Sequence, residues 1–440
     1  MKLRKNEIMR HFRDMIRLKT ISSVDSEETE EAFAGFRELL KREYPAVFRT
    51  GEGWLIGGRG VLIRIPGRSA AYPSVLMAHM DVVPAGDGWV CDPFSAELRD
   101  NRIWGRGTLD TKSTLCAIME AAEYCAENHI VPRNDLYLSF GAEEEISGDC
   151  CSMIVQFLKD RGVAPDLVLD EGGSVIPEGL PGVRKQAAMV GIAEKGTANY
   201  MLSVQDGQGG HASVPPKHTV IGRLCKAAVA IENHPFPARL STPVRLMFRE
   251  ISKEVPLPER PAFAHPELTS PAIRMMASAL GGTFNAMVRS TAAITIIQAN
   301  SAFNVLPDKA AMGVNMRLLE GDTVESAADS LRSIIRDPGV RVDLISGTDP
   351  TPVSEINCKA WYTLKRVISR TWKDTIVAPY QMNGGTDSRF YTDICSHIYR
   401  FSPMVMSKEE RSSVHGKNES ISVDALMKAV VFYIRLMKEL

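Results

Sequence analysis

Two side chains that could carry chemistry stand together at the end of an apolar run. The stretch VLMAHMDVVP, residues 75–84, begins with four apolar residues and then places His79 and Asp81 one residue apart. Residues i and i+2 of a strand share a face. Asp81 can therefore orient one ring nitrogen of His79 while the other nitrogen binds a metal. A histidine held by a nearby aspartate, without any metal, explains the pair equally well, so the argument needs further residues.

Other metal-capable side chains follow strands or precede helices. Asp110 lies in the turn GRGTLDTKST before an expected helix, and Asp170 and Glu171 end an expected strand. Three consecutive glutamates, 143–145, follow a strand that ends at Phe140. Such a run is solvated on an exposed turn, but if it is buried it requires cations. In a mainly parallel sheet all these positions share one rim, where ligands bind.

The types of these residues indicate the chemistry. Histidine nitrogen and carboxylate oxygen together favour zinc, cobalt or manganese over magnesium. One carboxylate that bridges two ions, with two further ligands on each ion, would make a hydrolytic two-metal site. Within a run of glutamates, one side chain can bind the metal while its neighbour removes a proton from water.

The elements that must position these residues alternate between helix and strand. Apolar periodicity predicts helices at about 6–18, 26–44, 113–128 and 150–161, and strands at about 61–66, 74–83, 135–140 and 165–170. This alternation predicts an α/β fold with a mainly parallel central sheet and helices on both faces.

The pattern changes after about Lys195. Strands and helices over residues 196–348 follow a β-α-β-β-α-β order with a long proline-rich connection at 235–266, which predicts an inserted two-layer α/β sandwich. We therefore expect one domain made of residues 1–195 and 349–440, interrupted by a second domain, 196–348.

Composition limits the partners and the compartment. The chain has 440 residues with a formal net charge of −1, so it lacks the basic excess of nucleic-acid-binding proteins. It has no apolar run of about 20 residues for a membrane span, and its charged start lacks the apolar core of a secretion signal. Eight cysteines without a CxxC pair predict reduced thiols in a cytoplasmic protein. Packing explains the adjacent Cys150 and Cys151 better than redox activity does.

Several motifs occur in a fixed order: AHMDVVP, GRGTLDTKS, SFGAEEEISG, LDEGG, GGHASVPP, NVLPDKA with NMR, NGGTDSRFY and HGKNESIS. Together they resemble the dizinc metallopeptidase family of aminoacylases, glutamate carboxypeptidases and succinyl-diaminopimelate desuccinylases. The closest resemblance is to its vacuolar carboxypeptidase S and N-acyl-amino-acid hydrolase branch. The resemblance extends from about Glu7 to the end of the chain. It implies a dizinc exopeptidase-like catalytic domain and an inserted domain that serves as lid and dimerisation surface.

The resemblance implies roles at the metal site. Five residues match the metal ligands of the family: His79, Asp110, Glu145, Asp170 and His415. Among them Asp110 would bridge both ions, and Glu171 is the alternative to Asp170. Asp81 matches the aspartate that orients the histidine ligand, and Glu144 matches the general base.

Other matched residues are expected to contact the substrate. His211 matches the lid histidine that polarises the scissile carbonyl and stabilises the oxyanion, commonly from the neighbouring subunit. Arg317 resembles the arginine that binds the substrate carboxylate. Asn304 is a further expected contact, and the backbone amides of Gly384 and Gly385 would bind the same carboxylate.

The expected activity is hydrolysis of a peptide or N-acyl amide bond next to a free carboxylate. The substrate would be a dipeptide, a short peptide or an N-acyl amino acid. The enzyme would be a homodimer with two divalent ions, zinc first and cobalt or manganese as alternatives, and no nucleic-acid or membrane partner is expected. A dizinc aminopeptidase is one rival, but an arginine for a carboxylate, Arg317, argues against it. A non-catalytic metal-binding relative is another, although no expected ligand or base is missing.

Overall fold

The computed structural model describes residues 3–23, 26–180, 183, 185–205, 207, 209–257, 260–300 and 302–440. Its main body is built on an eight-stranded sheet with the order β1-β2-β6-β3-β7-β16-β8-β15. In that order the strands are Glu52–Ile56, Gly60–Ile65, Leu136–Gly141, Ser74–His79, Leu167–Ile176, Ile398–Val405, Ala187–Glu194 and Ile376–Met382.

The sheet is mainly parallel at its centre. Strand β3 runs parallel to β6 and β7, β7 runs parallel to β16, and β15 runs parallel to β8. All six residues of β3 and all six of β6 are buried, as expected for strands covered on both faces. The predicted α/β fold with a mainly parallel central sheet is therefore confirmed.

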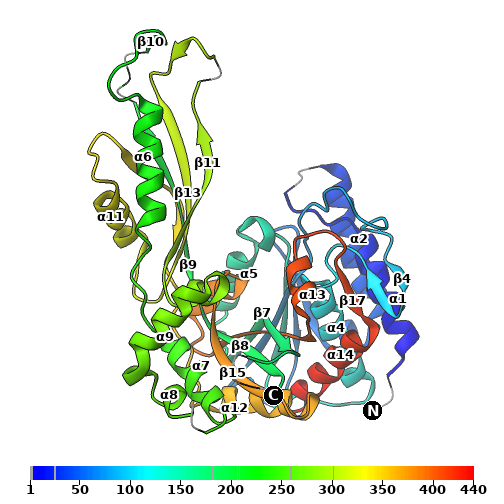
Figure 1. Cartoon of the computed structure of the whole chain (residues 1–440). Helices are drawn as coiled ribbons and strands as arrows, with labels where there is room; N and C mark the ends of the chain where they lie inside the picture. Colours follow the sequence, from blue (N-terminus) through cyan, green and yellow to red (C-terminus); the bar gives the residue numbers. More distant parts are fainter. Residues whose placement is uncertain are drawn as a thin grey trace.

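Helices from both ends of the chain cover this sheet (Figure 1). α4 and α14 pack on each other and on β3 and β16, α5 packs on β1, β2 and β6, and α12 packs on α14 and β15. The helices of the main body are α1 (Lys5–Arg17), α2 (Glu27–Glu43), α3 (Pro45–Thr50), α4 (Lys112–Glu127), α5 (Cys150–Lys159), α12 (Lys359–Thr371), α13 (Lys408–Ser413) and α14 (Val423–Met437). Among the described residues, no helix has the length and apolar character needed to cross a bilayer.

A second sheet forms an arm that stands away from the main body in Figure 1. It has four antiparallel strands in the order β11-β13-β9-β14. Helices α6 and α11 pack against it, which gives the predicted β-α-β-β-α-β sandwich. In chain order these elements are β9 (Gly196–Val204), α6 (Val220–Asn233), β11 (Thr291–Gln298), β13 (Ala310–Leu318), α11 (Val324–Ile335) and β14 (Arg341–Thr348).

The helices between α6 and β11 extend the main body, whereas Phe236, just after α6, packs on the four-stranded sheet. These helices are α7 (Thr242–Ser252), α8 (Arg260–Ala264), α9 (Pro266–Leu280) and α10 (Gly282–Met287). Val244, Met247 and Ile251 of α7 share an apolar cluster with Ala187 of β8 and Ala378 of β15. Hence the stretch expected to be a proline-rich connection contains helices that extend the main body. The domain boundaries at 195/196 and 348/349 stay a prediction.

One buried lysine lies where the two sheets are joined. Lys195 separates β8 from β9, and its Nζ donates hydrogen bonds to the carbonyl oxygens of Ala286 (2.5 Å) and Arg289 (2.7 Å). Burial, together with the charge of Arg317, lowers the pKa of Lys195 to about 8. The end of α10 is thereby tied to the base of the arm.

Candidate metal site

A first group of side chains converges at the carboxyl ends of β3 and β7. His79 is the last residue of β3, Glu171 lies on β7, and Asp110 precedes α4. His79 Nε2 lies 3.0 Å from Asp110 Oδ1 and 3.0 Å from Glu171 Oε1. His79 Nε2 can carry only one proton, so it cannot donate a full hydrogen bond to both carboxylates. A cation placed between the three groups would satisfy all of them.

Asp81 holds both His79 and the glutamate turn in place. Its Oδ1 lies 3.3 Å from His79 Nδ1, and its two carboxylate oxygens accept hydrogen bonds from the backbone amides of Glu144 (3.3 Å) and Glu145 (3.1 Å). Burial opposes the charge of Asp81, but hydrogen bonds from His79 and from Glu145 N outweigh it and lower its pKa. The backbone oxygen of Asp81 lies closer still, 3.0 Å from His79 Nδ1, so Asp81 contacts this ring nitrogen through both its main chain and its side chain.

A second triad shares Asp110 with the first. His415 Nε2 lies 3.0 Å from Asp110 Oδ2 and 3.0 Å from Glu145 Oε2. Hydrogen bonds to Asp110 and Glu145 raise the pKa of His415 to about 10. The two oxygens of Asp110 thus face two different histidines, which is the arrangement of a carboxylate that bridges two cations.

Glu144 lies beside the first triad. One of its carboxylate oxygens lies within 4.8 Å of a ligand atom of His79 and of Glu171. Burial raises the pKa of Glu144 well above its ordinary value, and the negative charges of Glu171 and Asp110 add to this effect against that of His79. Its neighbour Glu143 instead accepts from the backbone amide at the start of α5.

The carboxylate of Asp170 is held by two backbone amides. Its Oδ1 accepts from Glu171 N at 2.8 Å and its Oδ2 accepts from Ser388 N at 2.9 Å. The carboxylate beside His79 belongs to Glu171. Of the two alternatives expected from the sequence, Glu171 is thus the one in direct contact with His79, and the choice of metal ligand between them stays a prediction.

Burial and charge, in addition to geometry, favour a metal site here. Glu145 Oε1 is buried and has no hydrogen-bond partner among the described residues. Carboxylates gather around the two imidazoles: Asp81, Asp110, Glu144, Glu145 and Glu171. A buried acceptor and this excess of negative charge both require cations. The nitrogen and oxygen donor set suits zinc, cobalt or manganese.

A buried ion pair that the sequence reading missed joins the two loops of the site. Arg106 Nη1 donates to Glu419 Oε2 at 2.7 Å, and Glu419 Oε1 accepts from Leu109 N at 2.6 Å. Arg106 Nη2 also donates to the carbonyl oxygens of His415 (3.2 Å) and Gly416 (2.7 Å). Both side chains are buried. The position of Glu419, four residues after His415 in the same motif, was the available signal for this role.

His211 and Asn304 lie together at the far end of the arm. β10 (Gly210–His211) pairs with β12 (Val305–Leu306), and Ala212 N donates to Asn304 O at 3.1 Å. Figure 1 places β10 at the tip of the arm, far from the main sheet. The exposed His211 ring contacts Ser213 Oγ at 2.7 Å. The structure thus does not bring His211 or Asn304 to the metal residues of the same chain.

Arg317 and the NGG turn lie at the other end of the arm, near its base. Arg317 pairs with Thr197 across β13 and β9, and its Nη1 donates to Thr197 Oγ1 at 3.0 Å. The half-buried guanidinium has no carboxylate partner in the described part of the chain, and burial lowers its pKa. The amides of Gly384 and Gly385, after β15, have no hydrogen-bond acceptor among those residues either.

An α/β sheet that carries two histidine–carboxylate triads at one rim defines the class of metal-dependent hydrolases. Comparison with known sequences specifies the family within this class. The chain belongs to peptidase family M20/M25/M40, whose family model matches residues 75–439.

Relatives within the family have several names. The N-fatty-acyl-amino acid synthase/hydrolase PM20D1 of Xenopus tropicalis is 35% identical over 99% of this chain and 86% of that protein. The probable carboxypeptidase S-like 2 of Dictyostelium discoideum is 34% identical over 96% of this chain and 82% of that protein. The crystal structure of the M20 metallo-carboxypeptidase Sso-CP2 of Sulfolobus solfataricus has the same fold. Its TM-score is 0.70 at 17% identity, over 98% of each chain.

Proposed function

We propose that this chain is a two-metal hydrolase that cleaves the amide bond of N-acyl amino acids. The observation that carries the proposal is the position of Glu144, within 4.8 Å of His79 and Glu171 and next in sequence to Glu145 of the second triad. We propose zinc for both ions, with cobalt or manganese as alternatives. His79, Asp110 and Glu171 would hold one ion, and Asp110, Glu145 and His415 would hold the other.

The chain's own residues account for the proton transfers. When bound, the two divalent ions would polarise the substrate carbonyl and make a nearby water more acidic. Glu144 takes the proton from the attacking water and later delivers it to the leaving amine nitrogen. Asp81 fixes the direction of this carboxylate through the backbone of the glutamate turn.

The candidate substrate contacts favour a substrate with a free carboxylate. Arg317 is a half-buried guanidinium without a carboxylate partner among the described residues, and the amides of Gly384 and Gly385 are available. Arginine and paired amides bind carboxylates well. An aminopeptidase has no use for such an arginine. Cleavage of dipeptides or short peptides at the carboxyl end is the second candidate, which the carboxypeptidase name of one relative favours.

The arrangement of the arm supports a homodimer. Arg317 lies at the base end of β13, whereas β12 and Asn304 precede the other end of this strand at Ala310. Seven residues of strand separate these ends by roughly 23 Å, so one substrate cannot touch both in a single chain. We propose that His211 and Asn304 reach the metal site of a second subunit. We also propose a cytoplasmic location, which eight free thiols favour.

Mixed dimers test this proposal. His211→Ala subunits and Glu144→Gln subunits are each expected to be inactive alone. After random exchange, half the dimers are mixed and each has one complete site, so about a quarter of wild-type activity should return. If no activity returns although exchange is verified by mass, a second subunit does not supply His211.

The reaction itself is tested with Glu144→Gln. Wild-type protein loaded with zinc should release free amino acid from fatty-acyl and short-acyl amino acids. Glu144→Gln should lower turnover by about 10²–10⁴-fold while metal analysis shows an unchanged metal content. The matched control is Glu143→Gln, one residue away and outside both triads. Near-normal turnover in Glu144→Gln would show that Glu144 is not the base.

A further inference from the structure

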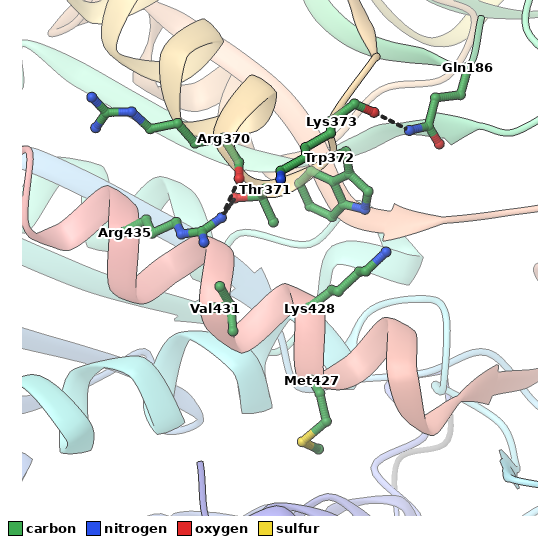
Figure 2. Close-up of a pocket in the computed structure, with 9 residues that line it drawn as sticks. All are labelled: Gln186, Arg370, Thr371, Trp372, Lys373, Met427, Lys428, Val431 and Arg435. Carbon is green, nitrogen blue, oxygen red and sulfur yellow. Dashed lines mark hydrogen bonds between the residues drawn. The ribbon is translucent and has the colours of Figure 1, made fainter. Parts of the chain in front are cut away.

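A cationic cleft lies on the side of the main body where β8 and β15 begin (Figure 2). Its volume is about 540 Å³, which is within the range of small-molecule sites. Four of its lining residues are cationic and none is acidic: Arg370, Lys373, Lys428 and Arg435. The whole chain has 52 basic and 53 acidic residues, so a cleft lined by four cations and no acidic residue differs from the average composition of the chain.

The cations of this cleft are only partly neutralised. Arg370 Nη1 donates to Glu439 Oε1 at 2.8 Å. Arg435 Nη1 donates to Arg370 O at 2.6 Å and Thr371 Oγ1 at 3.1 Å, which satisfies hydrogen bonds but leaves its charge unpaired. Among the described residues, Lys373 and Lys428 have no carboxylate within salt-bridge distance. Like charges held together without counter-charges repel one another and attract an anion.

A buried donor in the same cleft also lacks an acceptor. Trp372 is 2% exposed, and its Nε1 has no hydrogen-bond partner in the described part of the chain. In Figure 2 the side chain of Lys428 extends from α14 toward the Trp372 ring. An indole N–H and an ammonium are both donors only. An unpaired buried donor costs about 1–3 kcal/mol, so this corner of the cleft favours a ligand that supplies acceptor oxygens.

The cleft is separate from the proposed metal site. Gln186, which lines it, directly precedes β8, and Lys373 lies three residues before β15. These two strands run parallel, and their opposite ends lead to Lys195 and to the NGG turn. β8 runs antiparallel to β7, so strand direction alone does not separate the two sites, but the cleft is lined mainly by residues at the end of α12 and along α14, and none of its lining residues belongs to either triad. A ligand in the cleft would therefore be held by a different set of side chains from a substrate or product in the metal site.

We propose that this cleft binds an organic phosphate. A phosphate monoester carries close to two negative charges and three acceptor oxygens, which matches two unpaired ammonium groups and an indole N–H. A single carboxylate would leave one ammonium group unneutralised. Met427, Val431 and the Trp372 ring also line the cleft and would contact the organic part of the ligand.

Calorimetric titration of the intact metal-loaded protein with phenyl phosphate and with inorganic phosphate tests the proposal. We expect saturable binding of phenyl phosphate, at least about tenfold weaker in Lys373→Gln/Lys428→Gln. Trp372→Phe replaces the indole with a smaller aromatic ring that lacks the N–H, and should weaken binding by about three- to tenfold. The matched control is Lys359→Gln, an exposed lysine at the start of α12, which should bind as wild type does.

The outcomes are distinct. Because a metal centre can itself bind phosphate, His415→Ala is titrated as well; it should lose binding at the metal centre but keep phenyl phosphate binding in the cleft. If the double lysine variant binds as wild type does, or if Lys359→Gln weakens binding equally, the cleft is not the site. If inorganic phosphate binds as tightly as phenyl phosphate, the apolar residues do not take part and an organic phosphate is not the ligand.

Discussion

Replacing Glu419 with glutamine tests whether the buried ion pair positions the two loops of the metal site. Burial raises the pKa of Glu419, although Leu109 N and Arg106 act against this effect. The pair is therefore not a large net source of stability. Removing one partner is different, because Arg106 would remain charged, buried and without a carboxylate. Breaking a buried pair in this way costs about 3–5 kcal/mol.

The structure also predicts an effect on metal binding. Glu419 accepts from the amide next to Asp110, and Arg106 donates to the carbonyl of His415, so both proposed ligands lose their support. Loss of such partners typically lowers metal affinity by about 10–100-fold. Arg106→Met should destabilise less than Glu419→Gln, because Leu109 N still binds the carboxylate. The double variant Arg106→Met/Glu419→Gln should lose less stability than the two single losses added together, because neither charge is then left buried alone. Its metal affinity should stay low.

Two measurements separate these effects. Denaturant unfolding of the metal-depleted protein gives the loss in free energy, and competition with a chromophoric chelator gives the metal affinity. Glu38→Gln is the control, because Glu38 lies in an exposed pair with Lys41 and should change stability by less than about 1 kcal/mol. If Glu419→Gln lowers stability but leaves metal affinity unchanged, the pair does not position the ligands.

Three further predictions follow from single contacts. Glu171→Gln should lower the bound metal by about one equivalent, whereas Asp170→Asn should keep both ions; metal analysis after gel filtration showing the reverse would restore Asp170 as a ligand. Arg317→Met should raise KM for N-acyl amino acids by about 10–100-fold, and steady-state kinetics should show no such rise for substrates whose carboxylate is amidated. Because the pKa of Lys195 falls from 10.5 to about 8 on folding, unfolding takes up a proton between these values, and stability should rise with pH across this window by about 3 kcal/mol. Denaturation midpoints of Lys195→Met between pH 8 and 10.5 should lack this rise.

The sequence predicts which side chains converge at the proposed metal site because most of them follow strands or precede a helix. The expected contact between His79 and Asp81 is observed at 3.3 Å, although β3 ends at His79 and Asp81 lies just beyond the strand. The choice between Asp170 and Glu171 does not follow from alternation. Asp170 pairs with Arg400 of β16, but the next pair is Gly173 with Phe401. This irregularity leaves Glu171 and Gly172 of β7 without partners in β16, so regular pairing does not fix the direction of the Glu171 side chain.

The helices between α6 and β11 were not predicted from the sequence, for a different reason. Pro243 and Pro266 lie in the first turns of α7 and α9, where proline is tolerated because its missing N–H has no partner in a helix. A high density of proline therefore marked helix starts and not an irregular connection. That these helices pack on β15 depends on contacts distant in sequence, which periodicity does not report.

The order of the proposed ligands along the chain has a consequence for biosynthesis. His79, Asp110 and Glu171 are all synthesised within the first 171 residues, and β3 and β7 pair directly with each other. His415 and Glu419 leave the ribosome hundreds of residues later. A nascent chain could therefore capture one ion early, whereas the second can enter only after translation has nearly finished. Cellular metal supply would then limit the second ion after release from the ribosome, and a protein with one ion would be the intermediate to look for.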